Sequence, residues 1–299
     1  MLVQIESATR SRGPRLPDWL RKPVRNVDAD HELKKMLRTR GLHTVCEEAR
    51  CPNRNDCFLR GAATFMILGD VCSRSCGFCS VKTGRGSPIE ALSKEPEQVA
   101  EAAADLKLSY VVITSVNRDE LPDGGAAHFA ETINAVRRRL PLARIEVLTP
   151  DFKGDLKALY TVLDAKPDTF NHNVETVARL YHRVRPQADY RQSLRVLREA
   201  RRYASAALTK SGFMVGFGED REEVKRLLED LREHEVDVVT IGQYLQPTRA
   251  HLSVEEYVHP DVFDEYKRFG EQLGFRAVFS GPMVRSSFMA EMINEIAEA

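Results

Sequence analysis

All six cysteines of this 299-residue chain lie in one short stretch, residues 46–80. They form two groups of three with different spacing: Cys46, Cys51 and Cys57, and then Cys72, Cys76 and Cys79. Three thiolates can hold three irons of a cubane iron–sulfur cluster and leave the fourth iron open for chemistry. A closed structural metal site uses four protein ligands instead. The second group, with its CxxxCxxC spacing, is therefore a candidate ligand set for a cluster with one open iron.

Two other uses of the cysteines fit the sequence less well. Three disulfides would tie together one short segment and leave the long remainder of the chain untouched, and a reducing interior disfavours them. A zinc site would need further ligands, but the chain has neither a paired CxxC nor an HxxxH pattern, and its histidines lack metal-ligand spacing. A zinc-bearing interaction module remains the alternative from a different functional class.

The composition narrows the functional classes further. Lys plus Arg and Asp plus Glu number 44 each, so no overall basic charge indicates nucleic-acid binding. The N-terminus lacks the apolar core of a signal peptide, and no apolar run approaches membrane-spanning length. We expect a soluble, monomeric protein of the cytoplasm or an organelle matrix, with no nucleic-acid or membrane partner.

Short apolar runs bounded by Gly, Pro, Asn or Asp recur after the first cysteine group, which is typical of buried strands. The predicted strands are residues 64–69, 110–116, 144–150, 169–175, 212–218, 237–245 and 277–282. Amphipathic patterns predict helices between them, for example over 129–140 and 224–231, and Ser93 and Asp220 are candidate helix starts. This alternation predicts parallel pairing with right-handed crossovers.

The predicted fold is α/β, a partial (β/α) barrel of about six parallel strands with N-terminal and C-terminal extensions. Residues 1–60 are expected to form an extension that carries the first cysteine group. Residues 61–275 would form the barrel, and residues 276–299 a C-terminal segment with the motif Arg285-Ser286-Ser287. The second cysteine group directly follows the first predicted barrel strand, where such barrels place their catalytic loops.

The sequence CSRSCGFC at 72–79, with Phe78 before the last cysteine, resembles the radical S-adenosylmethionine (SAM) superfamily. In that superfamily the open iron of a 4Fe–4S cluster is chelated by the amino and carboxylate groups of SAM. One electron from the cluster then splits the cofactor and yields a 5′-deoxyadenosyl radical. The cofactor carries the difficult chemistry, while the barrel holds the substrate and excludes water.

Motifs along the chain make this resemblance more specific. They are CEEARCPNRNDC (46–57), SVNRDELPDGGAAHF (115–129), NHNVETV (171–177), TKSGFMVGFGE (209–219) and GPMVRSS (281–287). Together with the CxxxCxxC loop they resemble lipoyl synthases, in the same order and over nearly the whole chain. A different radical enzyme, such as a biotin-synthase-like sulfur inserter, would keep the second cysteine group but need not have the first group and the RSS motif.

The resemblance implies a sulfurtransferase that inserts two sulfur atoms, at C6 and C8 of an octanoyl chain attached to a lysine of a carrier protein. The implied cofactors are SAM and two 4Fe–4S clusters. Cys46, Cys51 and Cys57 would bind an auxiliary cluster that donates sulfur, with a serine of the RSS motif as fourth ligand. We favour Ser287, with Ser286 as the alternative. Because a serine oxygen matches a sulfur-rich cluster less well than a thiolate, that corner should open more readily.

The resemblance also implies which residues serve catalysis and cofactor binding. Catalysis would rest on Cys72, Cys76, Cys79 and Ser287. Contacts with SAM are expected from Phe78, Thr114, Gly124, Gly125, Asn173, Glu175 and Lys210. Read without the family, the two glycines form an ordinary turn, and Asn173 and Glu175 are polar residues at a strand end.

The implied protein partner is an octanoylated lipoyl carrier domain, either the E2 subunit of a 2-oxoacid dehydrogenase or the H protein of glycine cleavage. Ferredoxin or flavodoxin would donate the electrons. The chain departs from the family pattern at two positions. Gln187 stands where glycine is usual, which puts a special backbone angle there in question, and Phe288 stands where tyrosine is common.

Overall fold

The computed structural model describes residues 15–21, 28–51, 53, 57 and 64–287. These residues contain one eight-stranded sheet with the strand order β1-β2-β5-β6-β7-β8-β9-β10. Its strands are β1 (His43–Thr44), β2 (Thr64–Ile67), β5 (Tyr110–Ser115), β6 (Arg144–Leu148), β7 (Thr169–Asn171), β8 (Leu208–Val215), β9 (Val238–Gln243) and β10 (Ala277–Ser280). All neighbours pair in parallel except β1 and β2. The sheet is open between β10 and β1, so the prediction of a partial (β/α) barrel is confirmed.

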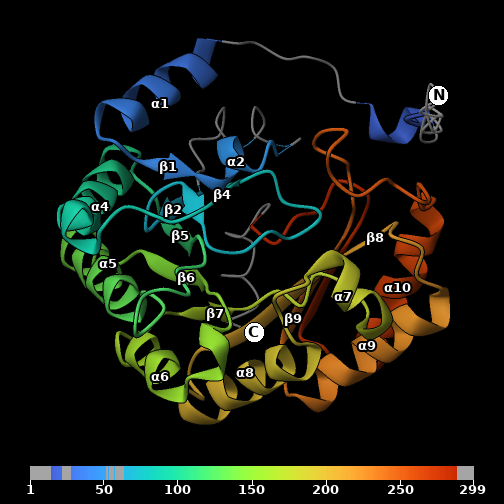
Figure 1. Ribbon diagram of the computed structural model, residues 1–299. Coiled ribbons are helices and arrows are strands. Elements are labelled where there is room, and N and C mark those ends of the chain that lie inside the picture. The colour runs from blue at the N-terminus through green and yellow to red at the C-terminus, as the bar shows by residue number, and fades with distance from the viewer. Residues whose placement is uncertain (1–14, 22–27, 52, 54–56, 58–63, 288–299) are drawn as a thin grey trace, which may run out of the picture.

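Helices cover the outer face of this curved sheet (Figure 1). The α-helices are α1 (Asp28–Thr39), α2 (Val45–Glu48), α4 (Glu95–Asp105), α5 (Ala126–Arg139), α6 (Leu156–Asp164), α7 (Tyr181–Val184), α8 (Tyr190–Tyr203), α9 (Arg221–Glu233) and α10 (Pro260–Gln272). Single turns of 3₁₀-helix occur at η1 (Asp18–Leu20), η2 (Ile89–Leu92), η3 (Phe152–Gly154) and η4 (Ala178–Leu180). None of the helices in the described residues has the length and apolar character needed to cross a membrane.

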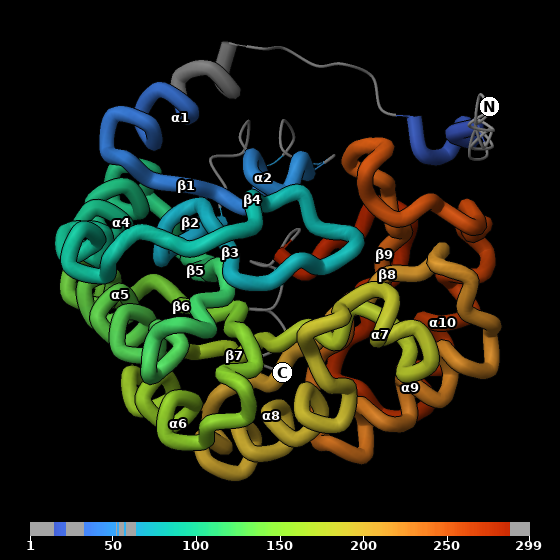
Figure 2. Tube along the Cα trace, in the orientation of Figure 1, coloured from blue at the N-terminus to red at the C-terminus, as the bar shows by residue number. Residues whose placement is uncertain are grey.

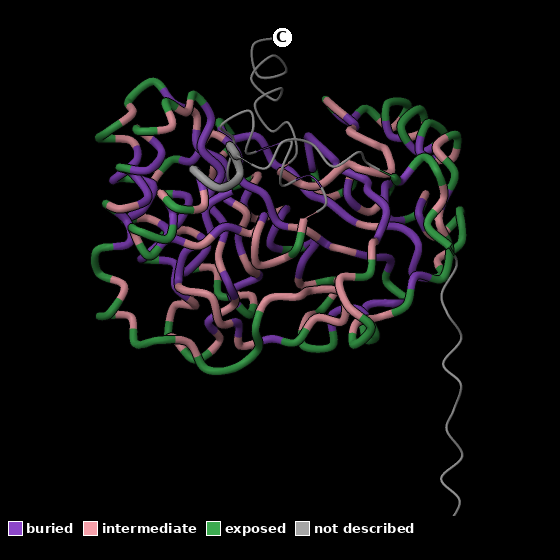
Figure 3. Tube along the Cα trace, turned by 90° about the horizontal axis from the view of Figure 1, so that it is seen from above, coloured by how far each residue is buried: buried purple, intermediate pink, exposed green. Residues whose placement is uncertain are grey.

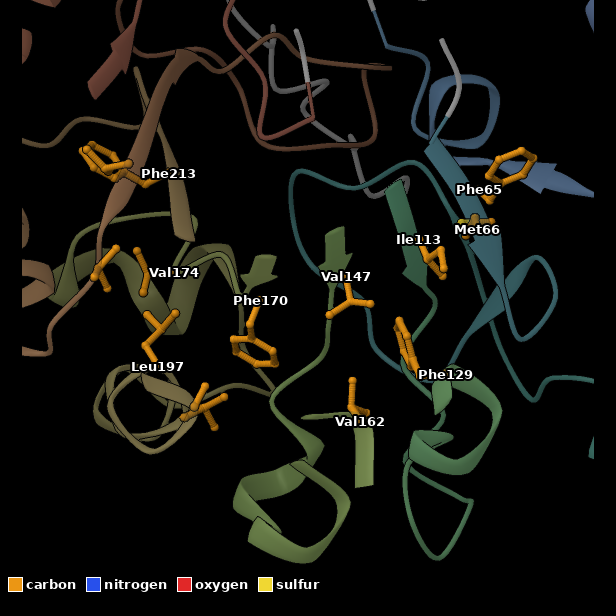
Figure 4. Close-up of a cluster of buried hydrophobic side chains, with 14 of the residues drawn as sticks. Phe65, Met66, Ile113, Phe129, Val147, Val162, Phe170, Val174, Leu197 and Phe213 are labelled. Atoms are coloured by element: carbon orange, nitrogen blue, oxygen red, sulfur yellow. The ribbon is translucent and has the colours of Figure 1, made fainter. Parts of the chain in front are cut away.

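The main core lies between the sheet and these helices. Ile113 on β5 and Val147 on β6 point toward Phe129 of α5 and Val162 of α6, and all four side chains are fully buried (Figure 4). Figure 3 shows buried chain through the interior and exposed chain around the rim. The opposite face of each strand points into the barrel, which explains why all four residues of β2 are buried.

The two predicted helix starts have different outcomes. Asp220 begins α9 as expected: its side chain accepts from the backbone N–H of Glu223, and the Glu223 side chain accepts from that of Asp220. The expectation for Ser93 is wrong, because α4 begins at Glu95 after the N-cap Lys94. Glu95 is buried and accepts from the Leu68 backbone, so tertiary contacts fix this helix end.

One barrel strand begins earlier than predicted, and two strands of the sheet come from the segments that flank the predicted barrel. β8 begins at Leu208, four residues before the predicted 212, because polar residues at its start are buried inside the barrel. β1 comes from the N-terminal extension and pairs antiparallel with β2. β10 comes from the C-terminal segment and pairs in parallel with β9. The chain on both sides of the barrel therefore contributes to the sheet.

The two small strands β3 (Val71–Cys72) and β4 (Lys82–Thr83) enclose the loop of the second cysteine group. Figure 2 shows this loop crossing the middle of the ring of strands, close to the chain that follows β10. Because the carboxyl ends of parallel strands meet at one edge of the barrel, the loops after β2, β5, β6 and β7 surround the same space. The candidate site lies there.

The turn before α5 yields a stability prediction. Gly125 is the N-cap of α5 with φ +90°, and a Cβ atom there would collide with the Leu68 side chain. Gly125→Ala should lower the free energy of unfolding by roughly 2–5 kcal/mol, the sum of left-handed strain and overpacking. The matched control is Gly274→Ala, which has φ +85° but open space, and should cost only about 1–2 kcal/mol. Equal losses in urea denaturation would contradict the steric argument.

Candidate active site

A cavity of about 460 Å³ lies at the carboxyl ends of the barrel strands, and its lining is mostly apolar. It brings together all six cysteines and both serines of the RSS motif: Cys46, Cys51, Cys57, Cys72, Cys76, Cys79, Ser286 and Ser287. None of the cysteines forms a disulfide. Two groups that were separate in the sequence therefore face one enclosed space.

The second cysteine group is held in place by the guanidinium of Arg74, which lies between Cys72 and Cys76. Arg74 donates to Asp119, after β5, at 2.7 and 2.9 Å and to Asp151, after β6, at 2.7 and 2.9 Å. Its side chain is 3% exposed, and that of Asp151 is fully buried. Although burial opposes ionisation, the charge and hydrogen bonds of Arg74 hold the pKa of Asp151 well below its usual range. These paired charges attach the loop to two strand ends.

Backbone contacts complete the fixation of this loop. The Cys72 thiol accepts from the backbone N–H groups of Arg74 at 3.4 Å and Asn117 at 3.3 Å. On the far side, Gly77 exchanges backbone hydrogen bonds with Val184 and Leu252. Such N–H···S contacts and nearby charges tune the reduction potential of a cluster bound through the thiolate.

The first cysteine group lies on α2 and the chain after it. Burial, reinforced by the charges of Cys51 and Cys57, raises the pKa of the Cys46 thiol to about 12. Burial likewise raises the pKa of Cys79, in the second group, to about 12. In each case the thiols whose charges raise the pKa belong to the same cysteine group as the affected thiol. Iron would displace these protons, because thiolates are the metal-binding form.

The C-terminal segment 281–287 reaches the cavity by crossing the end of β9. Gly281 donates to Ile241 and Gln243 donates to Pro282. A Cβ atom on Gly242 would collide with the Val284 carbonyl oxygen, so glycine is required at this crossing. Asn53, inside the first cysteine group, donates from Nδ2 to the Met283 carbonyl oxygen at 2.7 Å. This bond joins the first cysteine group to the RSS motif.

Ser286 and Ser287 have different surroundings. The Ser286 hydroxyl accepts from Asn173 Nδ2 at 3.3 Å, so it is bound to the end of β7. Ser287 lines the cavity without a hydrogen bond among the described partners. Burial lowers the pKa of the neighbouring Arg285 guanidinium, and the charge of Cys51 opposes that shift.

Of the seven residues expected to contact SAM, the structure brings four to the cavity: Phe78, Thr114, Asn173 and Glu175. Glu175 has φ +68° and forms a β-bridge with Phe213, which turns its carboxyl group inward. Burial raises the pKa of that carboxyl group, and the charge of Arg185 opposes the shift. The Oδ1 atom of Asn173 is buried without a partner, so it is available to a ligand's donor group.

The structure places Gly124, Gly125 and Lys210 away from the cavity lining. The two glycines form the turn before α5, as the reading without the family expects. Lys210 Nζ lies 3.0 Å from both carboxylate oxygens of Glu146, and both side chains are almost fully buried. Asn171 and Tyr110 also donate to Glu146, at 2.9 and 2.8 Å. Lys210 is therefore part of a closed polar network inside the barrel.

Two cavity residues were not predicted as ligands. His172 donates from Nδ1 to the Thr149 carbonyl oxygen at 2.9 Å, while its Nε2 is buried without a partner. Burial, aided by the charge of Arg185, lowers the pKa of His172 to about 4, so the imidazole is neutral and Nε2 is an acceptor. Arg185 donates to the Asn173 carbonyl oxygen and to Tyr181. The sequence gives no signal for either residue, because neither His172 nor Arg185 belongs to a recognisable metal-ligand spacing.

The departure at Gln187 also has a structural role. Its Oε1 accepts from the Ser75 backbone at 3.1 Å and its Nε2 donates to the Ser75 hydroxyl at 3.1 Å. Gln187 has no positive φ, so no special backbone angle occurs there. Phe288 lies outside the described residues.

The cysteine groups fit a cluster better than a single ion. Among the described residues, no three His, Cys, Asp or Glu side chains are arranged to hold one metal ion. Thiolates of a cubane do not converge on one point, because each binds a different iron. Three free thiols per group, buried or partly buried at the cavity, match the donors of such a cluster. The described residues therefore offer no site for a single zinc ion, which the zinc alternative would need.

Residues 66–231 match the radical SAM superfamily, so the fold and the site together define a radical SAM enzyme. Residues 4–51 match the N-terminal domain of lipoyl synthase of that family. The lipoyl synthase of Rubrobacter xylanophilus is 57% identical over 281 residues, which cover 94% of this chain and 87% of the relative. That of Caldicellulosiruptor bescii is 53% identical and covers 94% and 96%. The chain belongs to the lipoyl synthase family.

Solved structures support the fold alone. Coproporphyrinogen III oxidase (HemN) from Escherichia coli aligns with a TM-score of 0.54 at 16% identity over 68% of this chain. The [FeFe]-hydrogenase maturase HydG aligns with a TM-score of 0.53 at 13% identity over 85% of this chain. The alignments span only 51% and 56% of those longer chains.

Family membership confirms the functional prediction. The chain is a radical SAM sulfurtransferase that acts on a protein-bound octanoyl group and uses a 4Fe–4S cluster with SAM. The alternatives of a biotin-synthase-like enzyme and a zinc-bearing module are thereby set aside.

Because Lys210 lies in a closed polar network, we predict that its replacement changes the stability of the protein but not its affinity for SAM. Lys210→Met should lower the free energy of unfolding by about 3–5 kcal/mol, because it leaves the Glu146 charge buried and unpaired. Adding Glu146→Gln removes that charge and should recover part of the loss. In both variants the affinity for SAM, measured by equilibrium dialysis on reconstituted protein, should stay unchanged. Lower affinity with normal stability would show instead that Lys210 contacts the cofactor.

Proposed function

We propose that the one cavity holds both clusters of lipoyl synthesis, with the SAM-binding cluster on Cys72, Cys76 and Cys79 and the auxiliary cluster on Cys46, Cys51 and Cys57. The observation that carries this proposal is that both cysteine groups and the RSS motif line the same space. Two sulfur insertions, at C6 and C8 of the octanoyl chain, need a radical source and a sulfur source within reach of one substrate. A shared cavity meets that requirement.

The residues around the second cysteine group would bind and orient the cofactor. The bound cluster and SAM would supply the 5′-deoxyadenosyl radical. Phe78, Thr114, Asn173 and Glu175 are the proposed contacts, with Asn173 Oδ1 and the Glu175 carboxyl group accepting from hydroxyl groups. His172 Nε2 provides a further acceptor. The mostly apolar lining keeps water from a reactive radical.

Ser287 is the proposed fourth ligand of the auxiliary cluster, which would supply the inserted sulfur. Its neighbour Ser286 is engaged by Asn173, whereas the Ser287 hydroxyl carries no such bond among the described partners. Asn53 fixes the preceding residues against the first cysteine group. These contacts favour Ser287 over Ser286, in agreement with the expectation from the resemblance to the family.

The remaining assignments follow from the family and the chemistry. The substrate would be an octanoylated lipoyl carrier domain, of a 2-oxoacid dehydrogenase E2 subunit or of the glycine cleavage H protein. Ferredoxin or flavodoxin would supply electrons to a monomeric enzyme. Six free cysteines require a reducing compartment, which supports a cytoplasmic location.

The direct test is turnover of an octanoyl-lysyl peptide by the reconstituted full chain with SAM and a strong reductant. Mass spectrometry should show the peptide gain two sulfur atoms. Iron and acid-labile sulfide should match two 4Fe–4S clusters per chain. Protein that contains zinc instead, or that cleaves SAM without modifying the peptide, would contradict the proposal.

Replacing each cysteine group separately should separate SAM cleavage from sulfur insertion. Ala at Cys72, Cys76 and Cys79 should abolish both SAM cleavage and lipoyl formation, because no open iron remains for the cofactor. Ala at Cys46, Cys51 and Cys57 should retain reductive SAM cleavage, measured as 5′-deoxyadenosine, and abolish sulfur insertion. Sulfur insertion by the second variant would show that the donor lies elsewhere.

The two serines form a matched pair of variants. Ser287→Ala should lower lipoyl formation by at least about tenfold, the lower end of what loss of support costs a metal site, while SAM cleavage changes less. Ser286→Ala loses only its bond to Asn173 and should have the smaller effect on lipoyl formation. The reverse order of the two variants would assign the cluster ligand to Ser286.

A further inference from the structure

Arg285 carries a positive charge into the cavity next to the first cysteine group. Its Nη1 donates to the Val284 carbonyl oxygen at 2.6 Å and lies 3.5 Å from that of Pro282. Cys51 and Arg285 line the same cavity, and the charge of Cys51 acts on the guanidinium. Among the described residues, no carboxylate forms a salt bridge with Arg285. Among the described residues, the guanidinium therefore has hydrogen-bond partners but no carboxylate counter-ion.

The backbone fixes this charge in place. A Cβ atom on Gly242 would stand 3.1 Å from Arg285 Nη1 and would collide with Val284. Val284 donates to Gly281 at 3.0 Å, and Gln243 donates to Pro282 at 3.3 Å. The segment that carries Arg285 is thus seated against the end of β9, and the guanidinium is bound to the carbonyl oxygens of that same segment.

Two other arginines of the cavity lining, Arg74 and Arg185, are compensated differently. Arg74 forms salt bridges with Asp119 and Asp151. Arg185 interacts with the charges of Glu175 and Cys76. A cation taken out of water without an anion is costly, and a buried anion beside it offsets that cost. Arg285 has no such anion among the described residues, and an anionic group bound at the first cysteine group would supply one.

We propose that Arg285 is the counter-charge of the auxiliary cluster, where it favours cluster retention and raises the reduction potential. This inference rests on the proposed function, since it takes the first cysteine group as the auxiliary site. A cubane held by three thiolates and a serine oxygen is anionic, and reduction adds one more negative charge without a proton. A fixed cation nearby stabilises the reduced form more than the oxidised form, because the attraction grows with the charge of the cluster.

The experiment isolates the auxiliary cluster by using the full chain with Ala at Cys72, Cys76 and Cys79. Arg285→Gln and Arg285→Lys are made in this parent, and each reconstituted protein is titrated with dithionite while reduced cluster is followed by electron paramagnetic resonance. A second readout is the rate at which a chelator removes iron. We expect Arg285→Gln to shift the potential to more negative values and to speed iron loss. Arg285→Lys, which keeps the charge, should stay close to the parent.

The complementary control has Ala at Cys46, Cys51 and Cys57, so that only the SAM-binding cluster remains. There Arg285→Gln should leave the potential unchanged, because the guanidinium faces the other group. An equal shift at both clusters, or no shift at the auxiliary cluster, would overturn the proposal.

The remaining outcomes concern variants in which the auxiliary cluster does not assemble. If Arg285→Gln assembles no auxiliary cluster but Arg285→Lys does, charge is required and the proposal stands. If neither variant assembles one, the hydrogen bonds to Val284 and Pro282 are the essential feature and the proposal fails. A parent that assembles no cluster at the first cysteine group would instead refute the proposed function.

Discussion

The buried charge network of Arg74 is the interaction on which the active site depends. Asp119 and Asp151 follow neighbouring strands, and one guanidinium joins both to the loop of the second cysteine group. Removing either side of a buried ion pair typically costs about 3–5 kcal/mol, so the loop has one strongly preferred position. That position points three cysteines into the cavity before any metal binds. Cluster binding then has less conformational entropy to overcome than it would in a free loop.

The first cysteine group is assembled in a different way, from distant parts of the chain. Asn53 and Met283 are joined by one hydrogen bond across 230 positions, and β1 and β10 add both flanking segments to the sheet. Such long-range contacts form only once the barrel holds their ends together. The position of the first cysteine group therefore depends on the folded barrel, whereas the loop of the second group is anchored to two adjacent strand ends.

The sequence predicts the architecture well because apolar periodicity reports burial directly. Each predicted barrel strand overlaps an observed one, and both cysteine groups singled out by their spacing line the cavity. The sequence fails to predict features that depend on a buried polar residue whose partner lies far away in the chain. Lys210 extends β8 because Glu146, from another strand, neutralises it, and no local pattern contains that pairing. The inward direction of His172, Arg185 and Arg285 likewise depends on strand ends that only the folded sheet brings together.

Charge is distributed unequally between the two halves of the cavity, and this follows from their chemistry. Around the second cysteine group, carboxylates already balance Arg74 and accompany Arg185, so the site is nearly self-compensated before a cluster and a cationic cofactor enter. Around the first group, Arg285 has no carboxylate partner among the described residues, so an anionic cluster there completes the balance. Under the proposed function, a sulfonium cofactor would bind best where positive charge is already balanced, whereas an anionic cluster would gain from a nearby cation. Arg285, which has no carboxylate partner among the described residues, would then meet the second need from the C-terminal segment of the same cavity.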